Sequence, residues 1–280
     1  MKGDWTKLFI VVSQLAIIAI LFYSMIFSNL TSKITAGAEA KPYSGNVAVI
    51  PIKGDIAVDT YEFSGYASSD DVVPIIERAS NNPEIKAIIF DINSRGGSLV
   101  GSIEIADAIK ASNKTTVSWV RENTQSGAYY IASATDWIIA NKESDVGSIG
   151  VIVQYQIFNL TYETVKSGKF KDMFTDNRLL TDEERKIVQE SADASYGSFV
   201  NDIASNRGMD HDVVAELASG LTWTGVRAKE LGLVDEIGSK REVLDYIRAQ
   251  IGEEPAIVYY NKNTQDFDLQ YPSSPTEDGG

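Results

Sequence analysis

A serine stands at the head of an apolar, small-residue stretch, TQSGAYYIASA, at residues 124–134. The tyrosines and the isoleucine of this stretch recur at helical spacing, which predicts a buried helix that begins just after Ser126. A helix N-terminus presents unpaired N–H groups and partial positive charge, the surroundings that an acyl-transfer nucleophile needs. Ser126 is therefore a candidate nucleophile, and its alternative role is that of a plain helix N-cap.

The composition limits the base that could activate this serine. The 280 residues include no cysteine, which excludes a thiol nucleophile, a disulfide framework and a cysteine zinc site. The one histidine, His211, lies in the polar segment NRGMDHDVV, which is typical of an exposed helix start. A Ser-His-Asp triad would have to use that position, so lysine is the main candidate base.

Three lysines lie close together in TYETVKSGKFKDMF, residues 161–174: Lys166, Lys169 and Lys171. Phe170, Met173 and Phe174 flank Lys171, and desolvation by such neighbours lowers the pKa of an ammonium group toward the range of a useful base. The residues alone do not choose among the three lysines. An ordinary surface role is the alternative for each.

Two glycine-containing segments are expected near the serine. SRGGS, at residues 94–98, follows a predicted strand, so Gly96 and Gly97 belong to the same rim of the sheet as Ser126. Glycines permit backbone conformations and close approaches that other residues do not, so their N–H groups could face an incoming carbonyl. The alternative is an ordinary strand-to-helix turn. DVGSIGVIV, at residues 145–153, is predicted to be a further strand that brings Ser148 into the same neighbourhood.

The hydrophobic pattern predicts an α/β fold with a largely parallel sheet. Alternating strands and helices are typical of βαβ units, which bind ligands at the carboxyl ends of their strands. A capping box of Thr181 and Glu184 opens the longest predicted helix. Strands are expected at 47–54, 86–93, 115–120 and 136–141, helices after Ser68 or Ser69 and over 99–112 and 181–208, and a closing helix, strand and turn in TWTGVRAKELGLVDEIGS.

The N-terminal residues predict a membrane anchor. Residues 8–27 are 20 residues without charge, enough to cross the ~30 Å hydrocarbon layer as a helix. Lys2 and Lys7 favour a cytoplasmic N-terminus and an extracytoplasmic body. A cleavable signal peptide is the alternative, because residues 36–38 look like a cleavage site. The expected organisation is a short N-terminus over 1–7, an anchor over 8–27, a tether over 28–45, a globular domain over 46–255 and a polar tail over 256–280.

The overall charge restricts the partners. A net charge of −14 argues against binding to nucleic acid and against a basic membrane-surface patch. Hydrophobic residues make up 44% of the chain, which fits one sizeable globular domain with an appendage.

Taken together, these segments resemble the signal peptide peptidase A family in its short, single-repeat form. Members of this family are membrane-bound serine proteases whose α/β fold, with repeated ββα and βαβ units, belongs to the Clp-protease and crotonase superfamily. The resemblance covers roughly residues 45–250 and is carried by six strings in this order: VAVIPIKGDI, IIFDINSRGGS, SGAYYIAS, VGSIGVIV, SGKFKDMFTDNRLLTDEER and LTWTGVRAKELGLVDEIG.

The resemblance implies a Ser-Lys dyad. Ser126 matches the family's nucleophile and Lys171 its general base, while Ser148 matches an accessory serine that orients the lysine. The family's oxyanion hole is matched by three glycines: Gly96, Gly97 and Gly127. In relatives, serine and lysine can come from adjacent subunits of a ring, commonly an octamer, so a homo-oligomer is expected. Remnant signal peptides in the membrane are the expected substrates, and neither a metal nor a cofactor is expected.

The chain departs from the family pattern at two positions. Arg95 stands where the family usually has proline, and Ala128 where it usually has a second glycine. Arg95 adds a charge near the substrate cleft, and Ala128 adds a methyl group to the nucleophile helix. Neither change removes a catalytic group, so both bear on substrate preference and efficiency.

Three other interpretations share part of this pattern. A crotonase-type acyl-CoA enzyme has the same fold, but the predicted anchor and Ser126, in place of the crotonase carboxylates, argue against it. The other two are a related Ser-Lys membrane protease with a specific protein substrate, such as the stomatin-specific one, and an inactive membrane-anchored scaffold.

Overall fold

The computed structural model describes residues 45–59, 65, 67–158, 163–175 and 177–260. The expected anchor over 8–27 and all but the last residue of the expected tether lie outside the described residues. Within the described ranges, no helix is long and apolar enough to cross a membrane.

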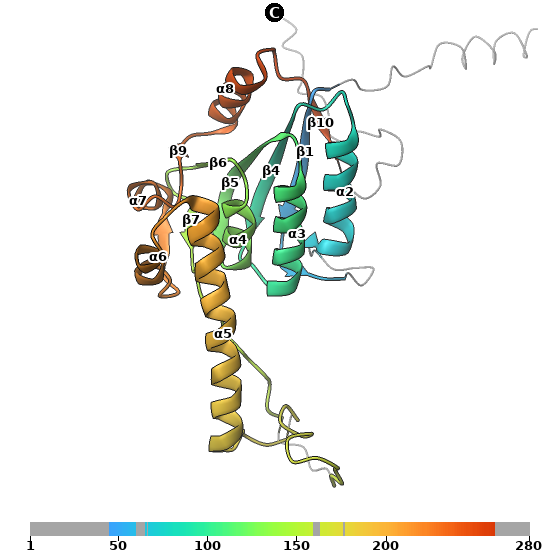
Figure 1. Ribbon diagram of the computed structural model, residues 1–280, viewed down its shortest axis with the longest axis vertical. Helices are drawn as coiled ribbons and strands as arrows, with labels where there is room; N and C mark the ends of the chain where they lie inside the picture. The colour runs from blue at the N-terminus through green and yellow to red at the C-terminus, as the bar shows by residue number, and fades with distance from the viewer. Residues whose placement is uncertain (1–44, 60–64, 66, 159–162, 176, 261–280) are drawn as a thin grey trace, which may run out of the picture. The chain divides into compact units, whose positions relative to one another are not determined.

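The main sheet is largely parallel, as the sequence predicts (Figure 1). Its central path runs β10–β1–β4–β5–β6–β9, and every pair along this path is parallel. The end of β5 also pairs in parallel with β7, which pairs antiparallel with β8. The strands are β1 Val47–Lys53, β4 Ala87–Ser94, β5 Thr115–Gln125, β6 Trp137–Ala140, β7 Asp145–Gly147, β8 Thr222–Thr224, β9 Glu236–Ile237 and β10 Ile257–Tyr259, with a separate pair of β2 Ile56–Ala57 and β3 Ala67–Ser68.

The helices begin at side chains that cap their free N–H groups. Ser68 caps α2, as one of the two predicted starts requires, and Thr181 forms the predicted capping box with Glu184 at the start of α5. Gly208 ends α5 in the left-handed conformation. The helices are α2 Ser69–Asn81, α3 Leu99–Ala111, α4 Gly127–Ser133, α5 Asp182–Arg207, α6 His211–Leu217, α7 Gly225–Glu230 and α8 Lys240–Ile251.

Three elements differ from the sequence prediction. β5 continues to Gln125, past the apolar run that ends at Val120, because its far end pairs with β7. The strand predicted over 145–153 stops at Gly147, since Ser148 has a φ of 50° that a strand cannot continue. β10 lies inside the expected tail, and its pairing with β1 extends the folded domain to Tyr260.

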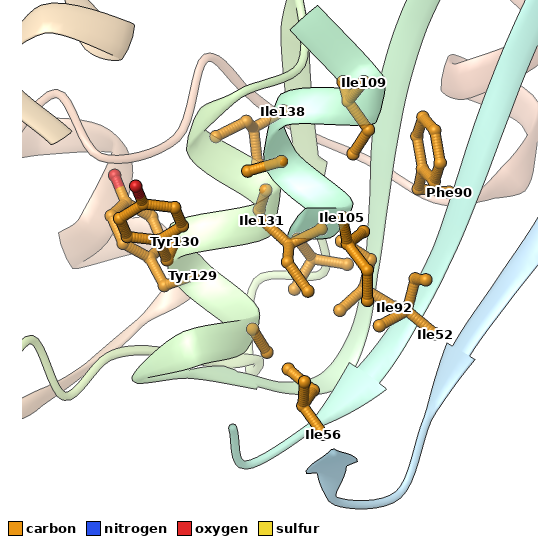
Figure 2. Close-up of a cluster of buried hydrophobic side chains, with 14 of the residues drawn as sticks. Ile52, Ile56, Phe90, Ile92, Ile105, Ile109, Tyr129, Tyr130, Ile131 and Ile138 are labelled. Carbon is orange, nitrogen blue, oxygen red and sulfur yellow. The ribbon is translucent and has the colours of Figure 1, made fainter. Parts of the chain in front are cut away.

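Alternate residues of the central strands face two separate apolar clusters. Ile50 and Ile52 of β1 join the larger cluster with residues of α2, α3 and α4, while Val47 and Val49 join the smaller one with Val243 of α8. Figure 2 shows the larger cluster, in which isoleucines of α3 and β4 lie beside Ile131 of α4. Helices therefore cover both faces of the sheet, and α4 is held by the larger cluster.

Helix α5 is buried near its C-terminal end. Phe199, Val200, Ile203 and Ala204 are buried there, whereas in its first four turns Glu184 alone is buried. The N-terminal half of α5 extends away from the sheet and carries the segment before it, residues 163–175 and 177–180 (Figure 1). We call this half of α5 together with residues 163–175 and 177–180 the arm.

Candidate active site

Ser126 lies at the junction between β5 and α4 in a conformation that few serines adopt. Its φ is 50° and its ψ is −125°, and its hydroxyl makes no capping hydrogen bond to α4. The plain N-cap alternative is therefore not met, because a capping side chain accepts a bond from the helix. A non-glycine residue held in such a sparsely populated region costs about 1–3 kcal/mol and is typical of functional sites.

The backbone around Ser126 is fixed from both sides. Its N–H donates to the carbonyl of Gly147 at 2.7 Å, and its carbonyl accepts from the N–H groups of Tyr129 and Tyr130 at 2.9 and 3.0 Å. Every residue of α4 is buried. Ser126 is thus partly exposed at the start of a buried helix.

The two tyrosines of α4 anchor the helix through their hydroxyls. The Tyr129 hydroxyl donates to the carbonyl of Leu233 at 2.9 Å, and the Tyr130 hydroxyl donates to Asp202 at 2.7 Å. Burial raises the pKa of both tyrosines, and the hydrogen bond to Asp202 raises that of Tyr130 further. Both hydroxyls therefore stay protonated and keep donating over the whole physiological pH range.

The glycine turn after β4 lies directly against the serine. A Cβ placed on Gly96 would come within 2.8 Å of both the Ser126 Cβ and the Gly127 nitrogen. Gly96 has a φ of 97° and Gly97 a φ of 150°, conformations that favour glycine. The turn is held by Ile56, whose N–H donates to the Gly96 carbonyl at 2.9 Å. The structure thus brings SRGGS and Ser126 together, as the sequence predicts.

Two N–H groups at this contact point have no partner in the described part of the chain: those of Gly97 and Gly127. A Cβ on Gly127 would lie 3.6 Å from the Gly97 nitrogen, so the two donors are close neighbours. The Gly96 N–H is already used, because it donates to the Ser94 Oγ at 3.0 Å. Of the three predicted oxyanion-hole glycines, two therefore offer free donors beside Ser126, and Gly96 contributes its conformation.

Ser148 comes out of the sheet next to Ser126. Gln125 pairs with Gly147 in the parallel register of β5 and β7, so the serines that follow them leave neighbouring strands side by side. Both serines have a φ of 50°, and the Ser148 N–H donates to the Leu221 carbonyl at 2.7 Å. The predicted neighbourhood of Ser126 and Ser148 is present in the structure.

The three candidate lysines differ in their contacts. The Lys166 ammonium pairs with Asp172 at 2.5 Å, and the Lys169 ammonium pairs with Glu183. The Lys171 ammonium makes no hydrogen bond or ion pair with any described residue, and its side chain lines a hollow of about 490 Å³ with Phe170, Met173, Phe174 and Thr175. Of the three lysines, Lys171 is therefore the one whose ammonium has no partner among the described residues.

Within one chain, Lys171 does not lie beside Ser126. Its segment is fastened to the start of α5, where Lys169 pairs with Glu183 and Arg178 pairs with Glu184. The Ser126 helix contacts α5 through Tyr130, whose ring lies 5.3 Å from that of Phe199. Fifteen residues separate Glu184 from Phe199, which is roughly 22 Å along a helix. The arm thus carries Lys171 away from the serine of its own chain.

The single histidine takes no part in this arrangement. His211 is exposed at the first position of α6, and its ring contacts Asp212 at 3.2 Å. Nor do His, Asp and Glu side chains gather in threes as a metal site would need anywhere in the described ranges.

Sequence reasoning missed three residues that shape the site: Ser94, Ser102 and Trp223. Ser94 holds the Gly96 N–H, the Ser102 Oγ would lie 2.3 Å from a Cβ on Gly127, and the Trp223 ring packs on Gly147. Each of the three acts through a close contact with a glycine. The glycine is distant in sequence for Ser102 and Trp223, and for Ser94 it lies two residues further along the same turn. The local sequence carries no signal for such contacts.

Comparison with known proteins places this geometry in a family context. Residues 108–252 match the family model described as peptidase family S49. The chain is 33% identical over 201 residues to a protein of Enterococcus faecium named putative signal peptide peptidase SppA. The aligned region covers 68% of this chain and 58% of that protein. It is 28% identical over 220 residues to chloroplastic serine protease SPPA of Arabidopsis thaliana, covering 75% of this chain and 32% of that protein. The chain thus spans well under two thirds of both relatives.

A solved structure shares the fold. A serine-to-alanine mutant of the 1510-N membrane-bound stomatin-specific protease superposes with a TM-score of 0.51 at 18% sequence identity, over 82% of this chain and 99% of that one. At this identity the likeness shows a common mixed α/β fold.

Proposed function

Since the chain belongs to peptidase family S49, we propose that it is a serine endopeptidase with Ser126 as nucleophile and Lys171 as general base. The observation that carries the proposal is the position of Ser126. It is half-exposed, strained and uncapped, beside two N–H groups that have no partner in the described part of the chain. A nucleophile next to preformed oxyanion donors is what acyl transfer needs.

The chemistry follows from these positions. Neutral Lys171 takes the Ser126 proton, and the oxygen attacks a peptide carbonyl. The N–H groups of Gly97 and Gly127 then stabilise the oxyanion of the tetrahedral intermediate. The lysine returns its proton to the leaving amine, and water, deprotonated in the same way, hydrolyses the acyl-enzyme. Ser148, beside Ser126, is the residue that we assign to orienting the lysine.

We assign the lysine in each site to a second copy of the chain. Two observations support this. Lys171 lies far from the serine of its own chain, and the arm exposes large apolar side chains, including Val165 at 92%, Leu179 at 67% and Phe174 at 53%. Exposed apolar patches of this kind mark protein or membrane contacts. A ring of copies, in which the arm of one reaches the serine of the next, completes the site.

The proposed substrates are remnant signal peptides, with the protease domain outside the cytoplasmic membrane and anchored by residues 8–27. The uncharged run in that segment supports the anchor. The name of the Enterococcus relative supports the substrate. Apolar peptides of this type also suit a site reached past the apolar side chains of the arm.

The proposal is tested by hydrolysis of an internally quenched, signal-peptide-like peptide in detergent. We expect turnover by the full chain, no turnover by Ser126→Ala or Lys171→Ala, and near-normal turnover by Lys169→Ala, which removes a neighbouring lysine already paired with Glu183. A folded, oligomeric wild type that cleaves no peptide would contradict the proposal and favour an inactive scaffold.

A further inference from the structure

Arg95 is an exposed cation at the edge of the proposed oxyanion hole. It comes directly before Gly96, whose backbone touches Ser126 and Gly127, and two residues before Gly97. Two trans peptide units place the Arg95 Cα at most about 7.6 Å from that of Gly97. Arg95 and Gly97 are both exposed, so a peptide bound at the Gly97 N–H would lie within a few residues of an accessible guanidinium.

Arg95 differs from the other arginines of the chain, because it has no hydrogen bond, ion pair or ring contact with any described residue. The remaining eight are all engaged: Arg78 over Tyr260, Arg121 with Asp91, Arg178 with Glu184, Arg185 with the Leu180 carbonyl, Arg207 with Asp235, Arg227 with Glu230, Arg241 with Glu242 and Arg248 with Glu254. Asp55 precedes Ile56, which bonds to the turn, yet it forms no ion pair with Arg95.

An unpaired arginine is unusual on a chain with a net charge of −14, where acidic partners are plentiful. A guanidinium stays charged at every physiological pH and binds carboxylates through paired N–H donors. Arg95 lies next to the turn that would hold the reacting carbonyl. From there its positive charge could bind a carboxylate of a bound peptide.

We propose that Arg95 selects peptides that carry an aspartate or glutamate within about two residues of the scissile bond. An extended peptide advances about 3.3–3.6 Å per residue, so a carboxylate one or two residues from the scissile carbonyl comes within reach of this guanidinium. The inference rests on the proposed peptidase activity and names a substrate class for it. The favoured peptides are acidic near the cleavage point, in addition to any apolar character that the rest of the site requires.

The test compares pairs of quenched peptides that are identical except for glutamate or glutamine at one position, scanned over two residues on each side of the scissile bond. The wild-type chain should favour glutamate at one of these positions by roughly 3- to 10-fold in kcat/KM, the range of an exposed to partly shielded charged pair. Arg95→Gln should bring this ratio close to one, and Arg95→Lys should keep part of it. Arg241→Gln, which removes an equal charge on α8, should leave the ratio unchanged.

High salt gives a second readout, since it screens exposed charge pairs and should shrink the wild-type ratio but not the ratio of Arg95→Gln. Equal cleavage of both peptides by the wild type, or a preference that survives Arg95→Gln, would overturn the inference while leaving the peptidase proposal intact. If the wild type shows no cleavage that depends on Ser126, the peptidase proposal is refuted, and the inference with it.

Discussion

At the scale of single residues, the site depends on backbone conformations that side chains normally avoid. Ser126 and Ser148 both have a φ of 50°, and glycines with positive φ stand next to or opposite them. Such strain persists only when the surrounding contacts over-determine it. Here the contacts are the Gly147 carbonyl, the buried α4 helix and the turn at Gly96.

The strain at Ser126 can be measured by comparing two variants that both lack the hydroxyl. We expect Ser126→Gly to be more stable than Ser126→Ala by about 1 kcal/mol in urea unfolding, because glycine adopts positive φ without cost. The control is Ser191, exposed inside α5, where alanine should instead exceed glycine by about 1 kcal/mol. If the alanine variant is more stable than the glycine variant at position 126 as well as at position 191, Ser126 is not strained.

Ser102 sets the space available to Gly127. In Gly127→Ala the new Cβ would lie 2.3 Å from the Ser102 Oγ, so we expect a lower melting temperature and a loss of turnover of roughly 10²-fold or more, as for a displaced oxyanion donor. Adding Ser102→Ala removes the clashing oxygen and leaves the Ser102 Cβ 3.4 Å away, so the double variant should recover most of its stability. Without such recovery in calorimetry, Ser102 would not be the cause of the glycine requirement.

At the scale of elements, the site residues lie at the C-terminal ends of neighbouring strands. The glycine turn follows β4, Ser126 follows β5 and Ser148 follows β7, and the register of β5 with β7 aligns the two serines. Helix α5 has a different task. Its C-terminal half packs on α4, and its N-terminal half holds the lysine segment through charged pairs.

The ion pair at the start of α5 should make the arm sensitive to acid. The hydrogen bond from Arg178 lowers the pKa of Glu184 from 4.5 to about 2, with a further contribution from the Thr181 N–H. Since the folded pKa lies below the unfolded one, the stabilisation is present above about pH 4.5 and is lost as the pH falls toward 2. Glu184→Gln should therefore lose less stability than the wild type between these two pH values.

Urea midpoints measured across this pH range check the prediction, with Glu230→Gln as the control for an exposed ion pair on α7. Parallel pH curves for the wild type and Glu184→Gln would show that the Arg178 pair contributes nothing to acid stability.

The sequence predicts much of this fold because its strands are continuous apolar runs and its longest helix has a capping box. It also places Ser126 and Gly97 on one rim, since both follow predicted strands, and it brings Ser148 near them within a strand predicted over 145–153. It does not predict that β5 extends to Gln125 or that β7 stops at Gly147, because both depend on pairing between distant segments. The contacts of Ser102 and Trp223 with glycines have the same long-range origin.

The residues alone do not choose among the three lysines. Apolar neighbours flank Lys171 in the sequence, but an ordinary surface role stays open for each lysine; the structure pairs Lys166 with Asp172 and Lys169 with Glu183 and leaves Lys171 without a described partner. Resemblance to a known family selected Lys171, and the ion pairs supply a physical reason for the same choice.

At the scale of the whole molecule, the proposed site needs more than one copy of the chain. If serine and lysine come from different copies, mixing inactive Ser126→Ala with inactive Lys171→Ala should restore activity. Random mixing in a closed ring should restore roughly a quarter of the wild-type rate, since half of the sites keep each residue independently. Continued inactivity of a mixture shown to exchange subunits would place both residues in one copy.

The use of a lysine as the base also predicts the pH dependence of the rate. The ammonium form cannot accept the Ser126 proton, so kcat/KM should rise from neutral toward alkaline pH. A profile that does not rise between neutral and alkaline pH, measured with the quenched peptide in conditions where the chain stays folded, would argue against Lys171.

If Ser126 is an activated nucleophile, it will react covalently with a serine-directed probe. A fluorophosphonate probe acylates activated serines and largely ignores ordinary hydroxyls. We predict that mass spectrometry of the labelled full chain will find the adduct on Ser126, and that Ser126→Ala and Lys171→Ala will abolish labelling while Lys169→Ala keeps it. A folded wild type that takes up no probe, or takes it up at another serine, would contradict the account.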